Sequence, residues 1–268
     1  MSAGIPLLRR LLIAIGWSGL GLVALAVVLS DFLARTQAGA VHAAPVLAPP
    51  SSLVPFGADL LGRDMLSETL HALNVTVASA APATLLAIVA GGMFGFVAAR
   101  FPLPLRFTLR WAVGVLAAVP ALLLAILLIG LTARDYAAVA AGLAAAPLAF
   151  VRAFDRARAQ SNSAHAEYAR ATGISPPTLL RRDLAYEVRD TFLSTAARAL
   201  AAVTIILSTV SFLGFGAVPP HRDLGLMIAA ARTTYLDAWW TAAFPALALI
   251  VLILLARLAA GLDEGERA

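Results

Sequence analysis

Few side chains in this 268-residue chain are suited to acid–base or metal chemistry. The chain has no cysteine, and all 20 of its basic residues are arginine, which excludes thiolate ligands and the Walker-type phosphate-binding loop with its lysine. The four histidines, at His42, His71, His165 and His221, lie far apart in the sequence, and no two have metal-ligand spacing. We therefore expect no catalytic site, no metal site and no cofactor bound by the chain itself.

Charged residues concentrate in the segment 152–190, which carries seven arginines and five acidic residues. Gly173 suits the end of a helix, Ser175 suits the N-cap of the next one, and Pro176 would then occupy its first position. The pattern predicts a helix, a tight turn and a second helix. Its internal order favours a docking element for a partner in water, and a solvated loop is the alternative.

A second polar segment, 56–67, precedes a long apolar run. From Leu66 onward, leucines recur at i, i+4 and i+7 (Leu66, Leu70 and Leu73), which predicts a short amphipathic helix over 60–73 with Asp59 as its N-cap. An interfacial helix leading into a membrane span would show the same periodicity. For Arg63 and Asp64, either a local ion pair or contact with a partner fits the sequence.

The composition that surrounds these segments is that of a membrane protein. The chain is 61% hydrophobic and 13% charged, with a mean hydropathy of +0.88, so it has too little charge to cover a soluble domain. Apolar runs of about 20 residues predict helices that cross a bilayer, because a backbone in lipid must satisfy its own hydrogen bonds. We predict an all-α, single-domain membrane protein over 1–268, and read residues 1–30 as part of the first span rather than a cleaved signal peptide. The predicted spans are 11–34, 74–99, 107–133, 136–151, 193–216 and 238–258.

Some residues within the spans carry further information. Gly91 and Gly95 have the small-xxx-small spacing that lets two helices approach closely. Three hydroxyl side chains share one face of the fifth span, either lining a polar path or bonding a neighbouring helix: Thr204, Ser208 and Ser211. Trp239 and Trp240 stand where the aromatic belt of a membrane protein is expected, so we predict that both anchor the interface.

The distribution of arginine predicts the orientation. With the N-terminus inside, 14 arginines fall on the inner side and 5 on the outer side, and positive loops stay in the cytoplasm. The outer ones are Arg35, Arg63, Arg134, Arg222 and Arg232. Both termini are therefore expected in the cytoplasm. The net charge of +5 then belongs to the inner membrane face, and we expect no nucleic-acid partner.

Three segments of this chain resemble the inner-membrane permease subunits of ABC importers for peptides and nickel. Residues 56–67 (FGADLLGRDMLS) are similar to the family's F-G-T-D-x-x-G-R-D-x-x-S segment. Residues 167–173 (EYARATG) are similar to its E-A-A-x-x-x-G loop, and residues 211–220 (SFLGFGAVPP) to its S-F-L-G-x-G-x-x-P-P segment. The chain departs from the family at Tyr168, where the loop has alanine, and at Ala185-Tyr186, where it has Leu-Pro.

The resemblance implies the permease fold of a type I importer in the bacterial inner membrane. The expected partners are a second, related permease, two cytoplasmic ATPases that use ATP and Mg, and an extracytoplasmic binding protein that lands on 59–73 and 221–237. Residues 152–190 would be the coupling loop. The ATPase-docking residues would be Glu167, Tyr168, Ala169, Arg170, Gly173, Arg181 and Arg182. The outer-face residues would be Asp59, Gly62, Arg63, Asp64 and Ser67.

The sequence leaves other functions open. A nickel or metal-chelate importer fits the same resemblance as a peptide importer. An ion-coupled secondary transporter has a similar composition, although the spans lack the central Asp, Glu or His that ion coupling usually needs. A membrane-embedded enzyme would need a nucleophile and base, paired carboxylates or metal ligands, and we find none of these patterns.

Overall fold

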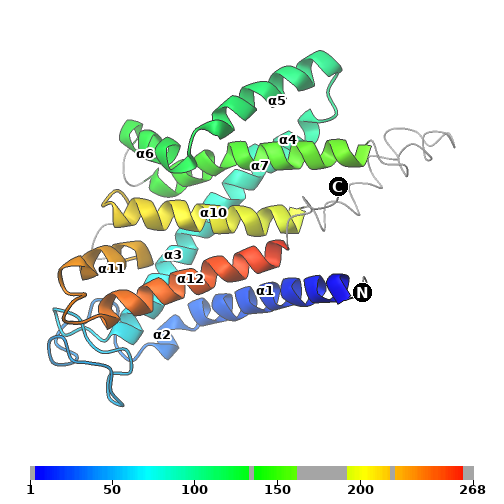
Figure 1. Cartoon of the computed structure of the whole chain (residues 1–268). Helices are drawn as coiled ribbons and strands as arrows, with labels where there is room; N and C mark the ends of the chain where they lie inside the picture. The colour runs from blue at the N-terminus through cyan, green and yellow to red at the C-terminus, as the bar shows by residue number, and fades with distance from the viewer. Residues whose placement is uncertain (1–3, 133–135, 162–191, 218–220, 262–268) are drawn as a thin grey trace.

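The structure is a computed structural model that describes residues 4–132, 136–161, 192–217 and 221–261 (Figure 1). The described residues form helices joined by loops, as the sequence predicted. The helices are α1 (Gly4–Val28), α2 (Ser30–Leu33), α3 (Met65–Ala87), the π-helix η1 (Ile88–Met93), α4 (Phe94–Ala98), α5 (Leu103–Ala118), α6 (Ala121–Leu131), α7 (Ala137–Ser161), α10 (Leu193–Phe212), α11 (Leu224–Ala230), the 3₁₀ turn η4 (Ala231–Thr233) and α12 (Trp240–Ala260).

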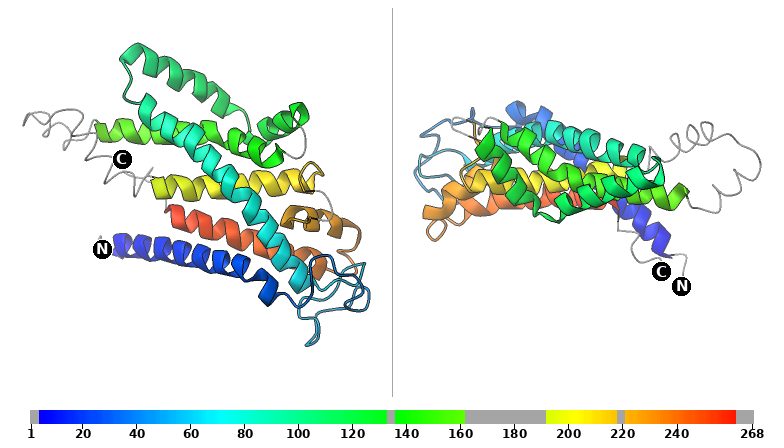
Figure 2. Two further views of the ribbon diagram at one scale, coloured as in Figure 1. Left: turned by 180° about the vertical axis from the view of Figure 1, so that it is seen from behind. Right: turned by 90° about the horizontal axis from the view of Figure 1, so that it is seen from above.

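The long helices lie side by side in the order α1, α12, α10 and α7, and α3 crosses them at an angle (Figures 1 and 2). Loop 34–64, α2 and α11 gather at one end of the bundle, which we call the loop end. The first turn of α1 and the last turns of α7 and α12 lie at the opposite end. Five described helical segments are long and apolar enough to cross a bilayer, or six if the bent pair α5–α6 counts as one span.

The second span is longer than predicted. Met65–Ala98 is one helical segment of 34 residues that includes the π-helical turn, so the separate amphipathic helix predicted over 60–73 is wrong. The helix begins at Met65 because Asp64, and not Asp59, is its N-cap, with the Asp64 carboxylate accepting from the Ser67 N–H. The amphipathic leucines therefore belong to the first turns of the span itself.

The third predicted span, 107–133, is broken in the structure. α5 and α6 meet at an angle of 87°. Val119 is extended between them (φ −71°, ψ 128°), as the residue before a proline prefers, and Pro120 offers no N–H to continue the helix. The third span predicted over 107–133 is therefore a bent pair of helices and not one continuous helix.

The remaining bounds shift by smaller amounts. α7 runs for 25 residues, so the fourth span is not short, and the first ten residues of the predicted loop 152–190 continue it as helix. Its last part, 162–190, lies outside the described residues. The first predicted span is divided between α1 and α2, and α10 and α12 occupy the fifth and sixth.

Small residues bring the central helices together. A Cβ atom added to Gly91 would lie 2.1 Å from the Ala146 carbonyl oxygen, and one added to Gly95 would lie 2.4 Å from that of Phe150. A Cβ atom on Gly142 would likewise meet the Ala83 oxygen at 2.6 Å. The segment from α3 to α4 and helix α7 are thus in backbone-to-backbone contact, as the small-xxx-small spacing predicted.

Candidate functional site

Polar side chains concentrate at the loop end, where the segment 56–67 folds back on the start of α3. Asp64 Oδ2 accepts from the Ser67 N–H at 3.0 Å and from the Ser67 hydroxyl at 2.6 Å. The Ser67 oxygen in turn accepts from the backbone N–H groups of Arg35 and Thr36, at 2.9 and 3.2 Å. Asp64 and Ser67 therefore join the two ends of loop 34–64, and both are buried.

Asp59 and Gly62 shape the turn before the helix. Asp59 Oδ1 accepts from the N–H groups of Leu61 and Arg63, at 2.8 and 3.0 Å, which is the local bonding of an Asx turn rather than a helix cap. Gly62 has φ +66°, and a Cβ there would lie 2.4 Å from the Ala44 oxygen. Only glycine fits this position without strain.

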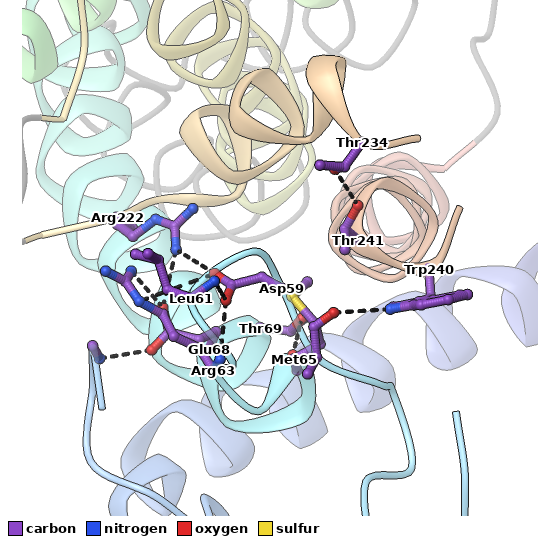
Figure 3. A network of polar contacts seen from close by, with 12 residues as sticks. Asp59, Leu61, Arg63, Met65, Glu68, Thr69, Arg222, Thr234, Trp240 and Thr241 are labelled. Atoms are coloured by element: carbon purple, nitrogen blue, oxygen red, sulfur yellow. Dashed lines mark hydrogen bonds and ion pairs between the residues drawn. The ribbon is translucent and has the colours of Figure 1, made fainter. Parts of the chain in front are cut away.

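Four charged side chains, which we call the charge cluster, meet beside this turn: Asp59, Arg63, Glu68 and Arg222 (Figure 3). Arg222 Nη1 lies 3.4 Å from Glu68 Oε2 and 3.6 Å from Asp59 Oδ2. Arg63 lies 3.7 Å from Glu68 and 4.0 Å from Asp59. The local ion pair of Arg63 with Asp64 considered from the sequence is therefore wrong, because Asp64 caps α3 while Arg63 pairs with Asp59 and Glu68.

The charge cluster connects segments far apart in the sequence. Glu68 is 5% exposed, and its Oε1 also accepts from the N–H of Gly39. Arg222 comes from the segment before α11 and is 18% exposed. Neither Glu68 nor Arg222 was among the predicted site residues. An acidic residue in the first turn of an apolar helix was the available signal for Glu68, and a lone arginine in an apolar loop was the signal for Arg222.

The residues after Arg222 fix α11 to its neighbours. Asp223 caps α11 by accepting from the Leu226 N–H at 2.7 Å, and it also accepts a hydrogen bond from Ser211 of α10. Burial raises the pKa of the Asp223 carboxyl, while its hydrogen bonds to Ser211 and to the backbone oppose that rise. The N–H of Leu224 donates to Thr76 of α3 at 3.1 Å, so α11 is joined to both long helices.

The three hydroxyl residues of α10 do not face an open path in this structure. Thr204, Ser208 and Ser211 are 0%, 4% and 2% exposed within this chain. Ser211 bonds Asp223, and the backbone of Ser208 lies against Gly225, where a Cβ would come within 2.2 Å of the Ser208 oxygen. Ser208 and Ser211 therefore seat α11, and the choice between a polar path and bonding to a neighbouring helix stays open for the three hydroxyl residues.

Two aromatic contacts fasten loop 34–64 to α12. Trp240 Nε1 donates to the Ala58 oxygen at 3.0 Å, and the rings of Phe56 and Phe244 stack with centroids 3.9 Å apart. Trp240 is 7% exposed, so the prediction that it anchors the membrane interface is wrong. Trp239 is 57% exposed and remains available for that role.

A cavity of about 560 Å³ opens between loop 34–64, α11 and the start of α12. Its polar wall is formed by Asp59, Arg63 and Arg222, and its apolar wall includes Leu226 and Met227. Among the described residues, no group of three His, Asp or Glu side chains is placed to hold a metal ion.

The opposite end of the bundle differs in charge. It carries the arginines of the first turns of α1, the connection from α4 to α5 and the last turns of α7 and α12, with Asp155 as the acidic side chain in those described segments. Arg110 of α5 and Asp155 of α7 form a bidentate pair there, with both bonds at 2.9 Å. The predicted docking residues, from Glu167 through Arg182, lie outside the described residues.

Comparison with known proteins gives a consistent result. The family described as "Binding-protein-dependent transport system inner membrane component" matches residues 91–262. A Brucella suis protein named as a peptide transport system permease is 28% identical, over 91% of this chain and 83% of its own length. The di/tripeptide transport system permease protein of Pseudomonas aeruginosa is 24% identical over 78% and 72% of the two chains. The glutathione transport system permease protein of Pectobacterium atrosepticum is 28% identical over 76% and 69%.

Proposed function

This chain belongs to the family of binding-protein-dependent transport system inner membrane components, and on that premise we propose that it is the permease subunit of an ATP-driven peptide importer. The observation that carries the proposal is the extent of the similarity. The family match covers most of the chain, and relatives aligned over at least two thirds of both lengths are named for peptide, di/tripeptide and glutathione transport.

The proposed orientation places the loop end outside the cell. The arginine-rich opposite end would then face the cytoplasm, together with both termini, as expected for short positive segments. The outer surface would be formed by loop 34–64 and α11, which the charge cluster and Trp240 hold together. This firmly joined surface suits a binding protein that delivers substrate to it, and a second, related permease would complete the path.

The chain itself would be non-catalytic, with ATP and Mg used by two ATPase subunits. We propose that the segment around 164–173, in the predicted coupling loop, transmits their movement to α7 and α10, which flank it in the sequence. Glu167, Tyr168, Ala169, Arg170, Arg181 and Arg182 would supply the contacts, and Gly173 the turn. The variants Gly173→Pro and Glu167→Lys should insert normally but lose transport. Normal uptake with full ATPase stimulation would contradict this assignment.

The whole proposal is tested by reconstituting this chain in liposomes with its partner permease, both ATPases and the binding protein. We expect uptake of a labelled dipeptide, and we expect this uptake to require ATP on the side of the membrane where the ATPases lie. Uptake of Ni²⁺ instead would favour the metal importer, and uptake driven by an ion gradient without ATP would favour a secondary transporter. A complex without any of the three activities would contradict the proposal.

A further inference from the structure

The guanidinium group of Arg222 has donors that the described residues do not use. Its contacts with the described residues are all made by Nη1, at 3.4 Å to Glu68 and 3.6 Å to Asp59. Both distances exceed the roughly 2.7–2.9 Å typical of a charge-assisted hydrogen bond. Among the described residues, Nε and Nη2 have no hydrogen-bond or ion-pair partner, and Arg222 lines the cavity.

The number of hydrogen-bond donors at the cavity wall also leaves some of them without an acceptor in the charge cluster. The two arginines of the charge cluster offer five N–H donors each. The carboxylates that face them are already bonded by the backbone, Asp59 by the N–H groups of Leu61 and Arg63 and Glu68 by that of Gly39. The charge cluster is thus neutral in formal charge, but its arginine N–H donors outnumber the carboxylate lone pairs left to accept from them. A ligand that supplies oxygen atoms would accept hydrogen bonds from the remaining donors.

The rest of the cavity favours an apolar group beside those oxygens. Leu226 and Met227 line it, together with Ala230 and Ala231. Thr234 and Thr241 also line the cavity. Their hydroxyl groups hydrogen-bond each other and backbone carbonyls, so they need no hydrogen bond from a ligand. A volume of about 560 Å³ falls within the range of small-molecule sites, roughly 300–1,000 Å³.

We propose that this cavity binds the terminal carboxylate of a short peptide, with the Arg222 guanidinium edge on the carboxylate and the last side chain of the peptide against Leu226, Met227 and Ala230. The inference rests on the proposed function, since it gives the permease its own contact with the substrate. The cavity walls are held by the charge cluster, Asp223 and Trp240, so little reorganisation is needed for binding.

The direct test measures binding of the dipeptide Ala-Leu and of its C-terminal amide to the full chain in lipid nanodiscs, without the binding protein. We expect the acid to bind at least about tenfold more tightly than the amide, since hydrogen bonds to charged groups are stronger than those to neutral groups. Arg222→Gln should abolish that difference. Arg232→Gln is the matched control, because Arg232 lies at the same end but stacks on Phe212 instead of lining the cavity.

A second variant leaves the charge cluster intact. Ala230 is exposed and lines the cavity, so Ala230→Trp should fill the space and abolish binding of both probes without unfolding the protein. Equal affinity of wild-type protein for acid and amide, or no binding of either, would overturn the inference. Arg222-dependent capture of the binding protein without any dipeptide binding would also overturn it, because the donors would then serve an acidic side chain of that protein.

The transport assay separates the two proposals. If Arg222→Gln leaves the half-saturating Ala-Leu concentration and the maximal rate of ATP-driven uptake unchanged, the carboxylate site is wrong while the importer stands. If wild-type protein with all its partners transports no peptide, the proposed function itself fails.

Discussion

The loop end and the middle of the bundle are held together by different means. At the loop end, Arg222 and Trp240 reach across from other elements to bond loop 34–64 and α3. In the middle, Gly91 and Gly95 let the backbone of one helix touch that of α7 with no side chain between them. Lipid tails are as apolar as the side chains, so no hydrophobic driving force brings helices together in the bilayer. Close packing of the helices joins them there instead. Near water, polar bonds can specify which segments meet.

The largest loss of stability is expected in the middle of the bundle, where the helices can touch only because glycine has no side chain. Gly91→Leu would drive a side chain into the Ala146 carbonyl, and overpacking with no room to relax should cost more than about 3 kcal/mol. We expect the variant to lose its folded population in size-exclusion chromatography and thermal unfolding. Gly21→Leu is the control, since nothing lies within 4 Å of a Cβ at Gly21. A Gly91 variant as stable as that control would contradict the backbone contact.

The next largest effect is expected in the charge cluster. Glu68→Gln keeps the shape of the side chain but leaves two arginines to share Asp59. Breaking a fully buried ion pair costs about 3–5 kcal/mol, and the partial exposure of both arginines should lower that cost here. Chemical unfolding in mixed micelles measures the change. Asp31→Asn, at a side chain that is 87% exposed, should change the free energy of unfolding little. If both variants changed the free energy of unfolding by the same amount, the charge cluster would contribute no more stability than an exposed charge.

A smaller effect is expected at the contact of α12 with loop 34–64. Trp240→Phe removes the indole N–H and leaves the Ala58 carbonyl without its donor, at a cost of about 1–2 kcal/mol. Trp239→Phe, at an exposed ring, should be close to neutral. Limited proteolysis of loop 34–64 gives a local measure, because cleavage should be faster in the Trp240 variant alone. Protection equal to wild type would show that the Phe56–Phe244 stack suffices.

The smallest effect is a dependence on pH at the start of α11. The pKa of Asp223 is raised in the folded protein, chiefly by burial. The folded state therefore holds this proton more tightly than the unfolded state, and its stabilising contribution is lost as pH rises from the usual aspartate pKa of about 3.9 through the raised value. Asp223→Asn keeps a capping oxygen and should remove that loss. Parallel melting temperatures of the two proteins across this pH range would contradict the shift.

The sequence predicted some structural details correctly and misjudged others for local reasons. The spacing of Gly91 and Gly95 predicted close helix packing, which the structure confirms. The N-cap was misplaced because Asp59 and Asp64 both precede helix-forming residues, and only the folded loop shows which carboxylate reaches an N–H of the first turn. Pro120 lies inside the predicted span 107–133, and its position alone did not show that the chain bends by 87° there, between α5 and α6.

By itself, the sequence determined that this chain is an all-α membrane protein, because long uncharged runs in lipid can satisfy their backbone groups only as helices. It also identified the segments 56–67 and 211–220 as distinctive. Only the tertiary structure decided that Ser208 and Ser211 seat α11, and that Arg222 pairs with Glu68, which lies 154 residues away in the chain. Such pairings depend on how the helices cross, and no periodicity within a single helix encodes that.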